Sequence, residues 1–427
     1  MHRRDLLTAV LAIGLSPAAR AAAAEGDYRA AARQAWIFAL PLIEMANTRS
    51  QGGVPNTLAH KRTLSTWQDR GVTAPNNDTL YSSAWIDLTR GPVILTVPPT
   101  GTRYQSIHIM NMYTDADAVL SPRTLGPGGG VFRLVSPDSR EKGPHVIRMT
   151  TPHGWLLART TVDGAADLAA AAAVQDGLKL QAPRCDPAPA YARRNARAAE
   201  VLGAAASLMA SDPPLPRDRA HLAWTVQVGA RALPTLSPDQ WAQVDLGLAD
   251  AKAELLGMLG RNRFIDGWSY PLPSLGIFGD DYSYRAIVAL VGLAALPVAE
   301  AMYMQPSGDT GTGEFHGDGL FRFTLKNPPP VDAFWSLTMY EITAQKQRFL
   351  TRNPLDRYSI GDRTPGLKYN ADGGLDIWIG RTDPGGDRTA NWLPAPTQGP
   401  YALSLRAYLP RPEFRDGRYR LPPIVPA

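Results

Sequence analysis

Two hydrophobic periods alternate along the chain. Residues 28–47 repeat apolar side chains every three to four positions after Asp27, which predicts an amphipathic helix capped by Asp27. Residues 79–162 repeat apolar side chains every second position, in short segments divided by glycine and proline, which predicts antiparallel strands. The expected strands are Leu80–Leu88, Val93–Val97, Tyr104–Met110, Val131–Val135, His145–Met149 and Trp155–Val162.

The middle of the chain returns to the helical period, and the last third returns to alternation. The uncharged stretch 286–299 is shorter than the roughly 20 residues that cross a bilayer, so we expect a buried helix there. The expected helices are Ala165–Leu180, Tyr191–Ala210, a helix from the cap Ser237 to Gly260, and Tyr282–Met304, and the expected strands are Leu320–Leu325, Phe334–Tyr340, Leu375–Ile379 and Tyr401–Tyr408.

This succession predicts an α+β protein with two β-sandwich, jelly-roll-like domains and a helical region between them. The expected boundaries are residues 22–163 for the N-terminal domain, 164–305 for the helical region and 306–427 for the C-terminal domain. The sequence shows no evident internal repeat, although two β-rich halves leave room for a distant duplication.

The first 21 residues have the form of an export signal. Arg3 and Arg4 precede an apolar stretch over residues 6–15 and a small-residue cleavage site at residues 19–21. The paired arginines favour the twin-arginine route, and the general secretory route stays open. We therefore expect a periplasmic or secreted protein without a transmembrane segment after cleavage.

Composition excludes several classes of protein. With 44% hydrophobic and 19% charged residues the chain is expected to be globular, and its single cysteine excludes an intrachain disulfide and a cysteine-based zinc site. The net charge of +5 comes from scattered arginines, so nucleic acid is not an expected partner. Residues 314–318, with Glu314 and His316, are expected to be a solvated loop and not a metal site. The sequence identifies no cofactor and determines no oligomeric state.

Candidate chemistry concentrates in the run Pro75–Ser82, where a strand begins. A period of two directs Leu80 and Ala84 to one face of this strand and leaves a polar and aromatic opposite face. The polar residues before the strand form either an Asx-rich turn or a corner that faces a ligand. The candidates in this run are Asn76, Asn77 and Thr79 for substrate binding and Asp78 and Tyr81 for catalysis.

The same half supplies further candidates for acid-base chemistry and anion binding. Asp78 is the candidate base or nucleophile, and Tyr81 and His108 are the candidate proton donors. His108 has a second interpretation as a structural histidine of its strand. Arg103 and Arg159 are the candidate anion clamps, because a guanidinium group binds carboxylate or phosphate with two parallel hydrogen bonds.

The last candidates lie in residues 334–340, where hydroxyl and aromatic side chains alternate with apolar ones. One face of this strand is expected to belong to the core, and the other suits a ligand with both polar and apolar groups. We expect Trp335 and Tyr340 to contact the ligand, together with Tyr113 from the first half.

Several of these segments resemble a bacterial envelope family catalogued as domain of unknown function 1254, followed by its usual partner, domain of unknown function 1214. The resemblance implies two β-rich domains with helices between them, and it brings no catalytic residues because the family has no agreed activity. It rests in the first half on Asn56, His60, Pro75–Ser82, Arg103–Tyr104 and Tyr113–Thr114, and in the second on Tyr282, Arg285–Ala286, Glu300–Ala301, Tyr303, Phe334–Thr338, Tyr340, Arg357–Ser359, Asp372–Gly373, Asn391–Pro396 and Arg406–Tyr408.

Two functions follow as expectations. The first is a hydrolase that acts on an anionic or polyhydroxylated small molecule or glycan. The alternative is a noncatalytic periplasmic binding protein or a structural protein of the cell envelope. Hydrogen-bonding contact between Asp78 and either His108 or an arginine, within one enclosed pocket, favours the enzyme.

Overall fold

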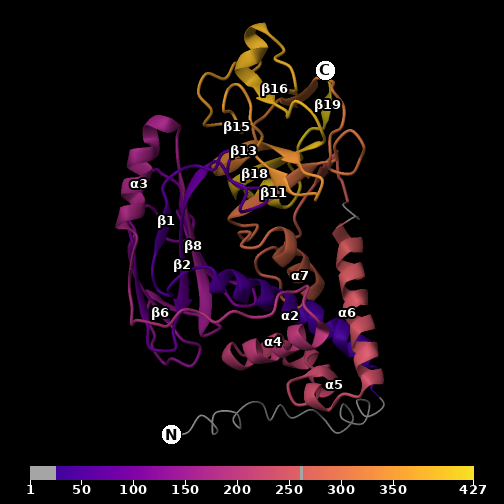
Figure 1. Ribbon diagram of the computed structural model, residues 1–427. Helices are drawn as coiled ribbons and strands as arrows, with labels where there is room; N and C mark the ends of the chain where they lie inside the picture. The colour runs from indigo at the N-terminus through magenta and orange to yellow at the C-terminus, as the bar shows by residue number, and fades with distance from the viewer. Residues whose placement is uncertain (1–25, 260–262) are drawn as a thin grey trace.

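The computed structural model describes residues 26–259 and 263–427. The export signal predicted at residues 1–21 lies outside these described residues. Within them the chain is an α+β protein, in which two groups of β-strands are separated along the chain by a helical region. Figure 1 shows the N-terminal strands on the left, the C-terminal strands at the top, and most of the helices below the C-terminal strands.

The N-terminal strands form a five-stranded sheet in the order β1-β2-β8-β4-β5 and a four-stranded sheet in the order β7-β6-β3-β9. Apolar side chains from both sheets meet in one core, to which β2 contributes Ala84 and Ile86 and β3 contributes Leu95. The strands are β1 Ala59–Lys61, β2 Thr79–Asp87, β3 Val93–Val97, β4 Gln105–Asn111, β5 Ala116–Leu120, β6 Gly130–Val135, β7 Val146–Arg148, β8 His153–Thr161 and β9 Lys179–Gln181.

The C-terminal strands also form two sheets. The first has the order β10-β11-β18-β13-β14, with β15 paired to β13, and the second has the order β17-β16-β12-β19. Their shared core includes Leu337 of β13, Leu405 of β18 and Ile377 of β16. The strands are β10 Trp268–Ser269, β11 Ala301–Pro306, β12 Phe321–Leu325, β13 Val331–Ile342, β14 Arg348–Phe349, β15 Ser359–Gly361, β16 Leu375–Gly380, β17 Trp392–Pro394, β18 Tyr401–Pro410 and β19 Ile424–Pro426.

The two groups of strands have the same topology. Strands β1, β2, β8, β4 and β5 correspond in order to β10, β11, β18, β13 and β14, and β7, β6, β3 and β9 correspond to β17, β16, β12 and β19. The parallel pair also recurs, as β6 with β7 and as β16 with β17. The structure therefore contains a repeat that the sequence does not display.

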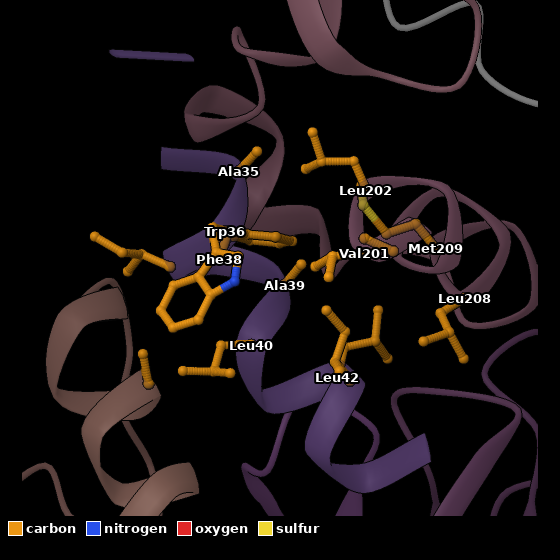
Figure 2. Packing of buried hydrophobic residues seen from close by; sticks show 14 of the residues in the cluster. Ala35, Trp36, Phe38, Ala39, Leu40, Leu42, Val201, Leu202, Leu208 and Met209 are labelled. Carbon is orange, nitrogen blue, oxygen red and sulfur yellow. The ribbon is translucent and has the colours of Figure 1, made fainter. Parts of the chain in front are cut away.

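The helical region packs around α2, which begins after the Asp27 cap as expected. Figure 2 shows α2 side chains such as Leu42 packed with Val201 and Leu208 of α4. Among the described helices, none combines the length and the apolar character that a membrane span requires. The helices are α2 Tyr28–Ser50, α3 Leu168–Gly177, α4 Ala198–Ser211, α5 Thr225–Val228, α6 Pro238–Leu259, α7 Tyr282–Val291 and α8 Pro412–Arg415, with 3-10 turns at Ala165–Asp167, Pro216–His221, Leu233–Thr235 and Gly386–Asn391.

The helix predicted over residues 282–304 is wrong in its second half. α7 ends at Val291, Gly292 follows, and the chain is extended again from Ala301 as β11. Gly292 and Pro297 interrupt the helical hydrogen bonds, and the pairing of β11 with β18 stabilises the extended form. Strand pairing comes from residues about 100 positions away, so the local pattern did not reveal it.

Two of the other predicted helices are shorter than expected. The helix expected over residues 165–180 is α3, which ends at Gly177 before the short strand β9. The helix expected over residues 191–210 begins only at Ala198.

Candidate functional site

The N-terminal five-stranded sheet carries a polar surface on the face opposite its core. Tyr81 of β2, Arg159 of β8 and Ser106 of β4 lie side by side across three strands. Opposed residues on one face of antiparallel strands lie about 5 Å apart, so these three side chains are neighbours. Thr79 precedes Tyr81 on the same face, and His108 follows Ser106 on it.

The C-terminal sheet presents a matching row. Tyr303 of β11, Arg406 of β18 and Ser336 of β13 oppose one another across three strands. This row lies on the face opposite the C-terminal core, because its neighbours Leu337 and Leu405 belong to that core.

The two polar faces meet between the halves of the molecule. The side-chain amide of Asn76 donates a hydrogen bond to the Tyr408 hydroxyl at 2.7 Å, and the Ser336 hydroxyl donates to Asp78 at 2.7 Å. The Tyr408 phenol also lies close enough to act electrostatically on Arg159. The polar surface of the first sheet is thus covered by the second half of the chain.

We call Thr79, Tyr81, Ser106, His108 and Arg159 the interface cluster. All but Tyr81 are buried, and Tyr81 is half-buried. The hydroxyls of Thr79 and Ser106, both ring nitrogens of His108 and one terminal nitrogen of Arg159 have no hydrogen-bond partner among the described residues. Since the great majority of buried polar atoms in proteins are paired, this concentration on one sheet face calls for a partner from outside the chain.

Arg159 is the charged member of the cluster. The residue is 6% exposed, and its guanidinium group donates a hydrogen bond from Nη2 to the Ala294 carbonyl oxygen at 2.8 Å. Its carbon Cζ lies 5.6 Å from the centre of the Tyr81 ring. No carboxylate among the described residues forms an ion pair with it, so a buried positive charge has no counter-charge.

His108 is uncharged at neutral pH. Burial, and to a smaller extent the nearby Arg159 charge, lower its pKa to about 3, and the Ala294 carbonyl opposes the shift only in part. A neutral imidazole keeps one N–H donor and one acceptor nitrogen. His108 therefore offers a hydrogen bond to a ligand, but it carries no proton to give as an acid near pH 7.

The run Asn76–Asp78 forms an Asx turn at the border of the cluster. The Asp78 amide donates to the Asn76 side-chain oxygen at 2.6 Å, and Asn77 donates to the Ser65 carbonyl oxygen at 2.6 Å. Among the described residues, no hydrogen bond joins Asp78 to His108 or to an arginine. Asp78 bonds to Ser336 instead, so the turn links the two halves of the molecule.

Three predicted residues lie outside the cluster. Arg103 forms a two-fold ion pair with Asp167 at 2.5 and 2.6 Å, and Tyr113 lies in the helical core, where its hydroxyl donates to a backbone oxygen at 2.8 Å. Trp335 points into the C-terminal core, on the face of β13 opposite Tyr340. The placement of Trp335 follows from which face β13 turns to the core, which the sequence left open.

Tyr340 lies on the polar face, where its hydroxyl donates to the Pro75 carbonyl oxygen and accepts from Arg406. The sequence did not single out Arg406, Ser336 or Tyr303 as site residues. Alternation in residues 401–408 places Arg406 opposite the core face, and that signal was available from the sequence.

A hollow of about 360 Å³ lies away from this cluster, in the helical region beside Phe38, Trp224 and Tyr282. The nearby Arg285 guanidinium is enclosed by aromatic rings, with Cζ at 4.9 Å from the Tyr282 ring centre. The described residues contain no group of three or more histidine, cysteine or acidic side chains able to hold a metal ion.

Two family models match the sequence of the chain. The model described as protein of unknown function DUF1254 matches residues 55–182, and the model described as protein of unknown function DUF1214 matches residues 300–412. No curated protein matches the chain.

Two solved structures resemble the chain. The crystal structure of the VPA0106 protein from Vibrio parahaemolyticus has a TM-score of 0.70 and 21% sequence identity, and the match covers 94% of this chain and 100% of that chain. The crystal structure of an uncharacterized protein from Burkholderia cenocepacia has a TM-score of 0.45 and 17% identity, over 95% of this chain and 89% of that chain. The first match shows a shared fold.

Proposed function

The chain belongs to the proteins that combine domain of unknown function 1254 with domain of unknown function 1214, and from its interface cluster we propose that it binds a small anionic molecule between its two halves. The observation that carries this proposal is Arg159, a buried guanidinium group with an unpartnered nitrogen and no ion pair among the described residues. An isolated buried charge is costly, and a bound anion offsets that cost.

The neighbours of Arg159 suit an anion. The hydroxyls of Ser106 and Thr79 have no partner among the described residues, and the neutral ring of His108 on the same face offers one donor and one acceptor. Tyr81 adds an aromatic ring that is half-buried, which suits the apolar part of a small ligand. Sites that bind carboxylate or phosphate usually contain an arginine together with several neutral hydrogen-bond donors.

Noncatalytic binding is supported better than hydrolysis. Asp78, the candidate base or nucleophile, bonds to Ser336, and the lowered pKa of His108 removes the proton that an acid would need. Hydrolysis of chromogenic esters, phosphates and glycosides by the full chain, lost on Asp78→Asn, is the result that would favour the enzyme over the binding protein.

Thermal-shift measurements on the full chain test the binding proposal. Phosphate, benzoate, glucuronate and citrate are compared with glucose, and hits are repeated by calorimetry. An anion at a hundred times its Kd stabilises the folded state by about 2.7 kcal/mol. We expect at least one anion to raise the Tm and Arg159→Met to remove that rise.

Arg103→Met is the matched control, because Arg103 is already paired with Asp167 outside the cluster. This variant should keep the anion-dependent rise in Tm. The proposal is wrong if no anion raises the Tm of the parent protein, or if Arg159→Met keeps the full rise.

Two expectations from the sequence, about the packing of the sheets and the location of the protein, are also part of this proposal. Each pair of sheets is a β-sandwich, which the shared apolar core of the two sheets in each half supports. The protein acts outside the cytoplasm, which the signal-like residues 1–21 support.

A further inference from the structure

The two halves of the chain correspond residue by residue at the interface. In the first half Tyr81, Arg159 and Ser106 oppose one another on β2, β8 and β4. In the second half Tyr303, Arg406 and Ser336 oppose one another on the equivalent strands β11, β18 and β13. In each half the chain supplies tyrosine, serine and arginine in that order.

Equivalent backbone hydrogen bonds in the two halves support this residue-by-residue correspondence. The amide of Val162, three residues after Arg159, donates to the Asp78 carbonyl oxygen at 3.1 Å. The amide of Leu409, three residues after Arg406, donates to the Glu300 carbonyl oxygen at 2.9 Å. Asp78 and Glu300 are thus equivalent.

Each of these acidic residues bonds to the opposite half of the molecule. Asp78 accepts from Ser336, and Glu300 accepts from the Tyr104 hydroxyl at 2.9 Å. The halves therefore face each other with related contacts, and their two arginines can be compared directly.

The two arginines differ in what surrounds them. Arg406 donates from Nη1 to the Thr338 hydroxyl at 2.8 Å and from Nη2 to the Tyr340 hydroxyl at 2.6 Å. The equivalent positions in the first half, two and four residues after the serine, hold His108 and Met110. Neither side chain is hydrogen-bonded to Arg159, so the acceptors that the protein provides for Arg406 are missing at Arg159.

The charges differ in the same way. The phenols of Tyr340 and Tyr408 act on Arg406 electrostatically, and the carboxylate of Asp78 acts on it after them. The groups that act on Arg159 most strongly are all phenols, those of Tyr81, Tyr303 and Tyr408. The surplus at Arg159 is therefore one positive charge.

We propose that the ligand presents a single carboxylate to Arg159, in the place that the Thr338 and Tyr340 hydroxyls take at Arg406. This inference rests on the proposed anion binding and names its chemical class. One carboxylate neutralises one guanidinium charge and matches its planar fork. A phosphate group carries about −1.5 to −2 charges at pH 7, which leaves a buried negative surplus.

The test compares benzoate and butyrate with inorganic phosphate and with benzamide, the neutral analogue of benzoate, by thermal shift and calorimetry on the full chain. We expect the carboxylates to raise the Tm, and phosphate and benzamide to bind at least tenfold more weakly than benzoate. Arg159→Met should weaken benzoate binding at least tenfold. Thr338→Val, which removes an acceptor of Arg406, should leave benzoate binding unchanged.

The outcomes separate this inference from the proposed function. If phosphate binds through Arg159 and carboxylates do not, the carboxylate assignment is wrong and anion binding stands. If benzamide binds as tightly as benzoate, the negative charge of the ligand does not contribute to binding and the carboxylate assignment is wrong. If Thr338→Val weakens benzoate binding as much as Arg159→Met does, the ligand is not held by the first half. If no anion binds, both proposals are wrong.

Discussion

The hydrogen bond between Asp78 and Ser336 is one of the buried side-chain contacts that tie the turn at residues 76–78 to the second half. Asp78→Ala removes a hydrogen bond to a charged group and leaves the Ser336 hydroxyl unpaired. We expect the free energy of unfolding to fall by about 1.5–3 kcal/mol, measured by urea denaturation.

Ser336→Ala and the double variant complete the cycle. Because each single change breaks the same hydrogen bond, the double variant should lose less stability than the sum of the two. Additivity within about 0.5 kcal/mol would show that the two residues do not interact.

His153 provides a pH-dependent contribution to stability. Burial lowers the pKa of His153, but its hydrogen bonds to Asp212, at 2.9 Å, and to Asp87 outweigh burial and raise the pKa above 6.5. The protonated ring is therefore favoured by folding. Its contribution is fully present below about pH 6.5 and is lost as the pH rises through the raised pKa of the folded state.

Urea denaturation at a series of pH values from below to above pH 6.5 checks whether stability falls as His153 loses its proton. The free energy of unfolding should fall with rising pH in the parent protein, and His153→Gln should remove that part of the slope. A parent protein that gains stability through the same interval contradicts the assignment.

At the scale of single residues, the sequence indicated part of the interface cluster. Residue type and position in the strands predicted three members of the interface cluster, Tyr81, His108 and Arg159. They also predicted Asp78, which lies beside the cluster. Arg406 was missed although the alternation of residues 401–408 places it opposite the core face; its partner Thr338 lies on the neighbouring strand β13, and the sequence does not show that β13 pairs with β18.

Among the elements, α2 is the central helix and α6 is peripheral on its outer face. Leu42 of α2 is fully buried, whereas Leu256 of α6 is 66% exposed. Leu42→Ala should cost about 2–5 kcal/mol because it leaves a cavity in the helical core. Leu256→Ala should stay within about 0.5 kcal/mol, as surface changes do.

Chemical denaturation of the two variants measures this difference. Equal losses of stability would show that α2 is not the centre of the helical core. The comparison holds the chemical change constant, so only burial differs between the variants.

Long elements with a clear period were predictable, and short ones were not. The alternation of β2 placed Ala84 in the core and Trp85 on the opposite face, and both placements are confirmed. β11 was predicted as helix because its residues have no strong alternation of their own, and pairing with β18 decides their conformation.

For the whole molecule, we predict that the mature protein begins close to Ala22 and resides in the periplasm, because Arg3 and Arg4 precede a short apolar segment and a small-residue site. N-terminal sequencing of the protein from the periplasmic fraction measures this. An intact Met1 on a cytoplasmic product would contradict the prediction.

The repeated topology also belongs to this scale. Nine strands of the first half have counterparts in the same order in the second, and the row Tyr81, Arg159 and Ser106 recurs as Tyr303, Arg406 and Ser336. A sheet requires alternation and turn residues, which many sequences satisfy, so two copies of one topology keep their shape after their sequences have diverged.

By itself the sequence determined the α+β class, most of the strands and helices, and the polar face that carries Tyr81, because each depends on residues close together in the chain. Only the tertiary structure decided that this face is buried against the second half and that Arg159 lacks the acceptors that Arg406 has. Burial and pairing depend on groups hundreds of positions apart, and local periodicity contains no information about which faces meet.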